Sequence, residues 1–128
     1  MNRKNYKVFL ITGGTAGHIY PALNLSQLLT SKGISNLIVT DHRGINFINK
    51  NKFNTKVIYS SHLKKKNIML LKGIIFLIIG FFQYTFLLIQ KKPKKIITFG
   101  SYASFIPIIC TYFFKKILKT KIYFHEQN

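Results

Sequence analysis

A glycine-rich run that ends in a histidine occupies residues 13–18, directly after a short apolar segment. It consists of Gly13, Gly14, Thr15, Ala16, Gly17 and His18. Glycines let a backbone turn tightly and approach a ligand closely, and the free N–H groups at the start of a following helix favour phosphate groups. The run matches neither G-x-G-x-x-G nor a P-loop. It therefore predicts a phosphate or diphosphate site, with an ordinary strand-to-helix turn as the alternative.

His18 adds a proton-transfer group to this run, because we expect it on the first turn of the helix that follows. Histidine changes its charge near neutral pH, so it is suited to take or give a proton during catalysis. A histidine at a helix start more often caps the helix or packs against it. The place of His18 beside a presumed phosphate site favours the catalytic interpretation.

A second glycine-bearing turn lies at residues 99–104, again between an apolar segment and a helical one. Its central residues are Gly100, Ser101 and Tyr102. Two such turns on neighbouring strands of one sheet can grip a diphosphate between them. The alternative is again an ordinary turn, in which Tyr102 serves only for packing.

The last four residues are polar and follow an apolar segment; they are His125, Glu126, Gln127 and Asn128. Such a cluster is suited to hydrogen-bonding a sugar or a ribose. A solvated loop is the alternative, but that interpretation leaves to chance the position of Glu126, one of only two acids in the chain.

Short apolar runs alternate with segments of helical periodicity along the whole chain. Strands are predicted at residues 7–12, 37–40, 56–59, 95–99 and 122–124, and helices at 19–31, 45–49, 68–91 and 107–118. This alternation predicts one α/β domain with a Rossmann-like, doubly wound parallel sheet. The three polar clusters then fall at the carboxyl ends of strands, where such sheets bind ligands. Because the chain ends at one of these places, we expect residues 1–128 to be a fragment or half of a two-domain site.

Twenty lysines and arginines stand against two acids, Asp41 and Glu126, which gives a net charge of +18. This excess indicates an anionic partner, and nucleic acid, anionic lipid and a phosphorylated substrate all qualify. A bias toward AT-rich codons is an alternative source of the lysines, but it does not account for the scarcity of acids. The single cysteine, Cys110, excludes a disulfide framework and a cysteine-built metal site, and we expect it to be buried and inert.

The segment at residues 68–91 is long and apolar, and Lys72 is the one charge before residue 91. It is long enough to span a bilayer, but it lies between two predicted strands of one sheet, where the fold requires a crossover helix. Lysines at residues 64–66 and 91–95 flank it, which favours docking on anionic lipid over spanning. A wholly buried helix is the third alternative, against which its aromatic residues argue. The side chains expected at the membrane are those of Lys72, Ile75, Ile79, Phe82 and Phe86.

Three blocks, GGTAGHIYPAL, FGSYAS and HEQN, together resemble the N-terminal domain of the MurG family of glycosyltransferases. The resemblance runs from about residue 7 to residue 128, and the first and last blocks are specific to this family. It implies the N-terminal, acceptor-binding half of a GT-B enzyme, with the donor-binding half absent from this chain. It also implies peptidoglycan synthesis: GlcNAc passes from UDP-GlcNAc to the lipid-linked precursor lipid I, with inversion and without a metal or cofactor. The implied location is the cytoplasmic face of the cell inner membrane, as a peripheral protein.

The resemblance also implies roles for single residues. Contacts to the donor sugar nucleotide fall to Thr15, Ala16, Gly17 and Asn128, and positions tied to activity are His18, Tyr102, His125 and Glu126. His18 is the first candidate for the general base on the acceptor hydroxyl, and Glu126 is the second. The family usually has glycine at Ala16 and at Ser101, so a positive φ at either position would strain the backbone.

Two other functions compete with this one. The chain can be a non-catalytic, membrane-anchoring acceptor subunit of a split GT-B enzyme, and the reading frame after Asn128 would separate the two cases. A basic nucleic-acid binder is disfavoured, because the lysines gather around an apolar segment rather than among stacking aromatics. We therefore expect a phosphorylated lipid substrate and anionic membrane lipid as partners, and no nucleic acid.

Overall fold

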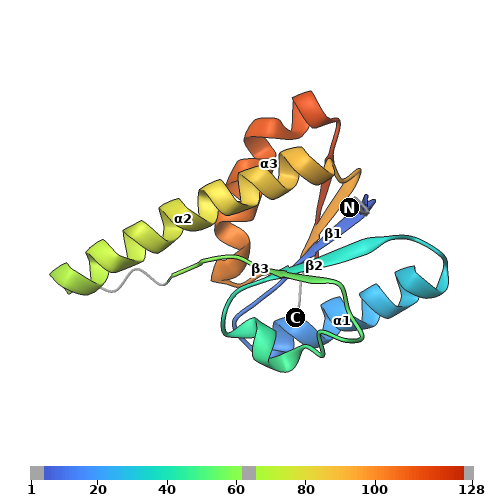
Figure 1. Ribbon diagram of the computed structural model, residues 1–128, viewed down its shortest axis with the longest axis horizontal. Helices are drawn as coiled ribbons and strands as arrows, with labels where there is room; N and C mark the ends of the chain where they lie inside the picture. Colours follow the sequence, from blue (N-terminus) through green and yellow to red (C-terminus); the bar gives the residue numbers. More distant parts are fainter. Residues whose placement is uncertain (1–4, 62–65, 126–128) are drawn as a thin grey trace.

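The computed structural model describes residues 5–61 and 66–125, which form a parallel sheet between layers of helices (Figure 1). Glu126 and Asn128, as well as Lys64 and Lys65, lie outside the described residues. The strands are β1 (Val8–Ile11), β2 (Asn36–Thr40), β3 (Thr55–Val57), β4 (Lys95–Thr98) and β5 (Lys121–Phe124). The helices are α1 (Ala16–Ser31), α2 (Asn67–Lys91) and α3 (Phe105–Leu118), with short 3-10 helices η1 (Gly44–Phe47) and η2 (Tyr102–Ser104).

The sheet has the strand order β3-β2-β1-β4-β5, and each neighbouring pair is parallel. Strands that are added outward on both sides of β1 define a doubly wound sheet. The predicted Rossmann-like α/β fold is therefore confirmed. The switch in direction falls between β1 and β4, so the segments that follow these two strands meet at the carboxyl edge of the sheet.

Alternating side chains of β1 supply the core on both faces of the sheet. Phe9 and Ile11 belong to a buried cluster with residues of α2 and α3, whereas Val8 and Leu10 belong to another with residues of α1. Figure 1 shows α1 below the strands of the sheet and α2 and α3 above them. Burial on both faces explains why β1 is a continuous apolar run rather than an alternating one.

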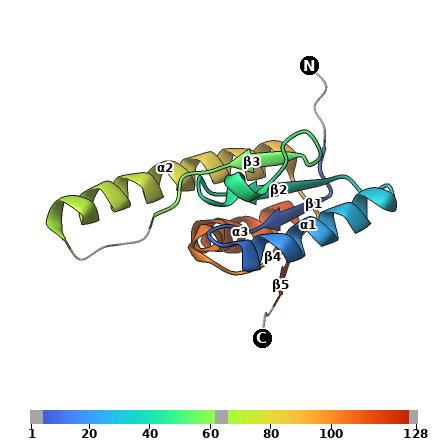
Figure 2. The same ribbon diagram turned by 90° about the horizontal axis from the view of Figure 1, so that it is seen from below.

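Helix α2 is buried over only part of its length. Tyr84, Leu87 and Leu88, in its second half, lie in the core, whereas the first half projects beyond the sheet in both views (Figures 1 and 2). Its most apolar stretch is 28% buried, and α2 is long and apolar enough to cross a membrane, a test that core helices of soluble proteins also pass. The strands on either side of it, β3 and β4, belong to the same parallel sheet, as a crossover helix requires.

The wholly buried alternative for this helix is thus wrong, although one of its aromatic residues is buried. Tyr84 is fully buried, because its hydroxyl group lies 3.0 Å from Thr111 Oγ1 and its ring contacts Phe9 edge-on. Gly80 lets α2 approach the end of β3, since a Cβ there would collide with the carbonyl oxygen of Tyr59. The Tyr59 N–H also donates to Gln83 Oε1 at 2.9 Å.

Helices α1 and α3 begin two or three residues earlier than predicted. Helix α1 begins at Ala16 rather than at residue 19, so Gly17 and His18 lie inside its first turn. Helix α3 begins at Phe105 rather than at Pro107, because a proline is tolerated in the first turn of a helix, where its missing N–H has no intrahelical partner. Cys110 is buried as predicted, and this burial raises the pKa of its thiol.

Candidate functional site

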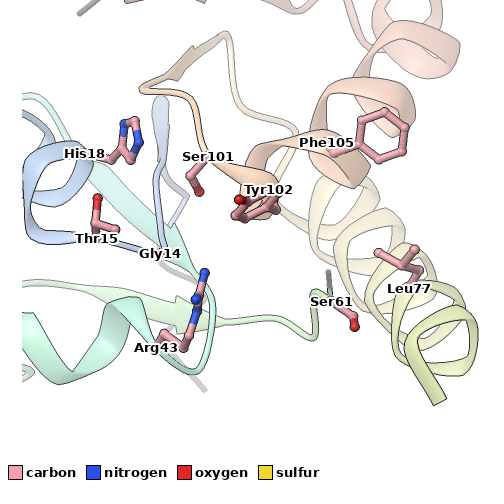
Figure 3. A pocket seen from close by; sticks show the side chains of 9 residues that line it. All are labelled: Gly14, Thr15, His18, Arg43, Ser61, Leu77, Ser101, Tyr102 and Phe105. Carbon is pink, nitrogen blue, oxygen red and sulfur yellow. The ribbon is translucent and has the colours of Figure 1, made fainter. Parts of the chain in front are cut away.

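A cavity of about 640 Å³ opens at the carboxyl ends of β1 and β4 (Figure 3). Five of its nine lining residues come from the two predicted glycine turns, and four come from elsewhere. The lining residues are Gly14, Thr15, His18, Ser101, Tyr102, Arg43, Ser61, Leu77 and Phe105. The fold therefore brings the first two predicted clusters to one cavity.

The two glycine turns touch each other at the base of this cavity. A Cβ at Gly13 would lie 2.5 Å from the Cβ of Ala103 and 2.8 Å from Asp41 Oδ1, so no other residue fits there without movement. Gly14 adopts a φ of 78°, a conformation that favours glycine. These two glycines are thus required by the fold itself, whatever ligand binds.

Gly17 differs from them, because a Cβ there would meet nothing closer than Thr15 Oγ1 at 3.9 Å. Thr15, the N-cap of α1, makes no side-chain capping bond, so its hydroxyl group does not occupy the N–H groups that point from the first helical turn. Such N–H groups attract phosphate. Packing within the chain therefore does not require glycine at position 17, whereas the close approach of a ligand would.

His18 is held at one ring nitrogen. Its Nδ1 lies 2.9 Å from the carbonyl oxygen of Phe99, and a carbonyl can only accept, so Nδ1 carries the hydrogen and donates it. In the neutral ring Nε2 then has the free lone pair. The ring also packs beside Gly100, where a Cβ would lie 3.6 Å from two of its atoms. This tautomer suits a group that accepts a proton.

Asp41 organises the glycine loop, a role that was not predicted from the sequence. Its Oδ1 accepts hydrogen bonds from the backbone N–H groups of Gly14, at 3.1 Å, and Gly44, at 2.7 Å. Its Oδ2 lies 3.4 Å from Ser60 Oγ and 3.8 Å from Arg43 Nε, and only 5% of the residue is exposed. The available signal was that one of two acids directly follows a predicted strand.

The second turn contains a strained residue. Ser101 has φ 75° and ψ 165°, a region occupied essentially by glycine, which costs about 1–3 kcal/mol. Its Oγ accepts from the Ala103 N–H at 3.2 Å, and Ser104 Oγ donates to the Gly100 carbonyl at 2.6 Å. The strain expected if Ser101 has a positive φ is thus present. Ala16, the other departure, lies in α1 and is not among the residues with positive φ.

His125 lies at the same edge of the sheet but does not line the cavity. Its backbone N–H donates to the Thr98 carbonyl at 2.9 Å, and its exposed ring lies 5.2 Å from the Phe99 ring, centroid to centroid. Phe99 thus contacts both His18, through its carbonyl, and His125, through its ring. Tyr102 lines the cavity and is half exposed.

A second cavity of about 390 Å³ adjoins the first and shares Arg43, Ser61 and Tyr102 with it. It is lined further by Lys72 and Phe76 from α2. The charged side chains that line the second cavity are those of Arg43 and Lys72, together with Asp41, which is ion-paired with Arg43. Neither Arg43 nor Ser61 was predicted, because each lies in a connection without a recognisable motif.

Residues 8–128 match the profile of the glycosyltransferase family 28 N-terminal domain. The chain belongs to this family. The match agrees with the resemblance of the three blocks to the MurG family, and it covers both glycine turns.

Relatives of this family 28 domain carry the name UDP-N-acetylglucosamine–N-acetylmuramyl-(pentapeptide) pyrophosphoryl-undecaprenol N-acetylglucosamine transferase. The protein from Wolbachia sp. subsp. Drosophila simulans (strain wRi) is 34% identical over 121 residues, which are 94% of this chain and 32% of that protein. The protein from Protochlamydia amoebophila (strain UWE25) is 35% identical over 127 residues, 95% of this chain and 33% of that protein. The chain thus spans about a third of the length of these relatives.

Among solved structures, MurG of Acinetobacter baumannii superimposes with a TM-score of 0.77 at 19% identity, over 96% of this chain and 36% of that one. The glycosyltransferase SsfS6 of Streptomyces sp. SF2575 superimposes with a TM-score of 0.59 at 14% identity, over 91% of this chain and 38% of that one. Both likenesses concern the fold, which is that of the N-terminal half of a GT-B glycosyltransferase.

Proposed function

We propose that this chain is the acceptor-binding domain of an inverting hexosyltransferase that transfers GlcNAc from UDP-GlcNAc to lipid I, which yields lipid II for peptidoglycan synthesis. The observation that carries the proposal is the meeting of two glycine turns around His18, with Nδ1 bound to the Phe99 carbonyl and Nε2 left to accept a proton. The names of the relatives supply the substrates.

In this proposal His18 Nε2 takes the proton from the C4 hydroxyl of the MurNAc unit. The hydroxyl oxygen attacks C1 of GlcNAc from the face opposite the diphosphate, the C1–O bond breaks and UDP leaves, so the configuration at C1 is inverted. Neither a metal nor a cofactor takes part. A base of this kind contributes about 100-fold to 10,000-fold in rate. Glu126 is the second candidate for the base.

The acceptor diphosphate binds between the two turns. Gly13, Gly14, Gly100 and Ser101 bring the backbone close to it, and Arg43 supplies positive charge. Tyr102 and His125 flank the acceptor sugars. Donor contacts come from Thr15, Ala16, Gly17 and Asn128, and from the part of the enzyme that corresponds to the remaining two thirds of the relatives.

The domain acts at the cytoplasmic face of the inner membrane, as a peripheral protein on anionic lipid. The side chains of Ile75, Ile79, Phe82 and Phe86 are all exposed on α2, and Lys72 is exposed beside them. A helix with exposed apolar side chains and nearby lysines is suited to lie in the interface, with its lysines on lipid phosphates. In this proposal lipid I reaches the cavity from the same membrane surface.

A binding titration of the 128-residue chain with a water-soluble lipid I analogue tests this proposal. We expect binding that Arg43→Gln weakens about tenfold, as measured by isothermal calorimetry, while Lys32→Gln at the far end of α1 leaves it unchanged. We also expect no transfer of radiolabelled GlcNAc by the chain alone, because donor binding falls largely to the other part of the enzyme. Equal weakening by both variants, or turnover by the chain alone, contradicts the proposal.

A further inference from the structure

An apolar groove of about 410 Å³ runs between α2 and α3. It is lined by Ile74, Leu77, Ile78, Phe81, Phe82 and Ile106. Every one of these side chains is apolar, and three of them, Ile74, Ile78 and Phe82, are exposed. An apolar surface of this kind marks a place where an apolar partner binds.

The groove continues the cavity that contains His18. Leu77 lines both, and Phe105 of the cavity is followed directly by Ile106 of the groove. In Figure 3 Leu77 and Phe105 lie on one side of the cavity, opposite Thr15 and His18. The cavity is thus polar at the glycine turns and apolar where it meets the two helices.

A ligand that fills both parts has an anionic group at one end and an apolar chain attached to it. The relatives are named for a pyrophosphoryl-undecaprenol acceptor, which is a diphosphate joined to a polyprenyl chain. We propose that the groove between α2 and α3 binds the first isoprene units of this acceptor. The inference rests on the proposed function and adds a subsite to it.

Such a subsite has a consequence for selectivity. Donor and acceptor are both sugar diphosphates, so a diphosphate cradle alone does not distinguish them. Only the acceptor carries an apolar chain at the diphosphate, and only that chain gains by leaving water for the groove. The groove therefore lets the domain itself bind the acceptor in preference to the donor, even without a bilayer.

The test compares methyl diphosphate with geranyl diphosphate, each titrated into the 128-residue chain without vesicles or detergent. Burial of two isoprene units predicts a dissociation constant for geranyl diphosphate that is lower by about tenfold or more. Ile78→Asn, in the groove, should reduce this preference to about twofold. Ile89→Asn is the matched control, because Ile89 is 48% exposed on the same helix, Ile78 is 51% exposed, and Ile89 does not line the groove.

Each outcome bears on one of the two proposals. Equal affinity for both diphosphates overturns the groove proposal and leaves the diphosphate cradle intact. An equal loss of the preference in Ile78→Asn and Ile89→Asn also overturns it, because it indicates general adsorption of the prenyl chain on α2. Binding of neither compound contradicts the proposed function itself. Thermal unfolding of both variants verifies that they fold, as expected for half-exposed positions.

Discussion

Asp41 Oδ1 lies 3.1 Å from the backbone nitrogen of Gly14, so a buried carboxylate after β2 fixes the glycine turn after β1. The same oxygen also accepts from Gly44, and removal of the carboxylate leaves two backbone donors without their acceptor. We expect Asp41→Ala to lower the free energy of unfolding by about 2–4 kcal/mol. Asp41→Asn keeps one acceptor oxygen and should lose less. Urea denaturation measures the free energy of unfolding of both variants. Equal losses would show that the charge of Asp41, rather than its hydrogen bonds, stabilises the fold.

His18→Ala should lower turnover by about 100-fold or more in an active transferase that contains this domain, because a general base is lost. Folding stability should change little, since the His18 ring is partly exposed and makes one side-chain hydrogen bond, to Phe99. Steady-state kinetics and thermal unfolding are the two measurements. Unchanged turnover together with a lower melting temperature would return His18 to a structural role.

Ser101→Gly should stabilise the domain by about 1 kcal/mol, because glycine relieves the positive φ at the cost of a weak cap. For a chain of this size that corresponds to a rise in Tm of about 3–5 °C. Ser101→Ala is the matched control: it keeps the Cβ and the strain, loses the bond to the Ala103 N–H, and should destabilise. A fall in Tm for Ser101→Gly would refute the strain argument.

Vesicle flotation tests the docking of α2. We expect binding that requires anionic lipid and is partly released by salt, because the Debye length falls from about 10 Å at 0.1 M to 3 Å at 1 M. Phe86→Ser should weaken it about tenfold or more, whereas Phe113→Ser should not, although Phe86 is 69% and Phe113 is 70% exposed. If the protein stays on the vesicles through high salt and alkaline carbonate, α2 spans the bilayer instead. That result would favour a membrane-anchoring subunit of a split enzyme.

Tyr84 should make the domain sensitive to alkali. Burial raises the pKa of its phenol well above the ordinary value of 10.0, so ionisation costs more in the folded than in the unfolded chain. The contribution of the protonated Tyr84 phenol to the free energy of unfolding is complete below about pH 10. It is lost as the pH rises from there toward the pKa of Tyr84 in the folded chain. Tyr84→Phe should be about 1 kcal/mol less stable at neutral pH, through the lost bond to Thr111. Urea denaturation from pH 7 to 11.5 should show the two curves converging; parallel curves would contradict this.

The fold was predictable because its signals are local. The run that forms β1 is apolar at every position and buried on both faces, and Gly33, with a φ of 71°, follows α1 where a helix terminates. Helix starts were less predictable: Gly17 suggested a loop, although a glycine in the first turn does not prevent a helix. The aromatic excess of α2 argued against a wholly buried helix, but the sequence does not reveal that Tyr84 is itself buried, with a hydroxyl partner on α3.

The site was predictable only where glycines marked it. Both glycine turns line the cavity as a pair, but Asp41 is separated from Gly14 by 27 positions, and no spacing rule relates them. Leu77 and Phe105 enter the cavity because α2 and α3 pack together on one face of the sheet, which is a tertiary event. The roles of His18 and of the other site residues stay predictions.

The described part of this domain contains one carboxylate, Asp41, and it is buried among its own hydrogen bonds. With a net charge of +18, the folded chain is a polycation that repels itself, and compaction works against that repulsion. Added salt should therefore stabilise the fold while it weakens adsorption to anionic lipid. An anionic surface acts as a counterion for the whole domain, so the protein should be most resistant to unfolding when it is adsorbed on such a surface.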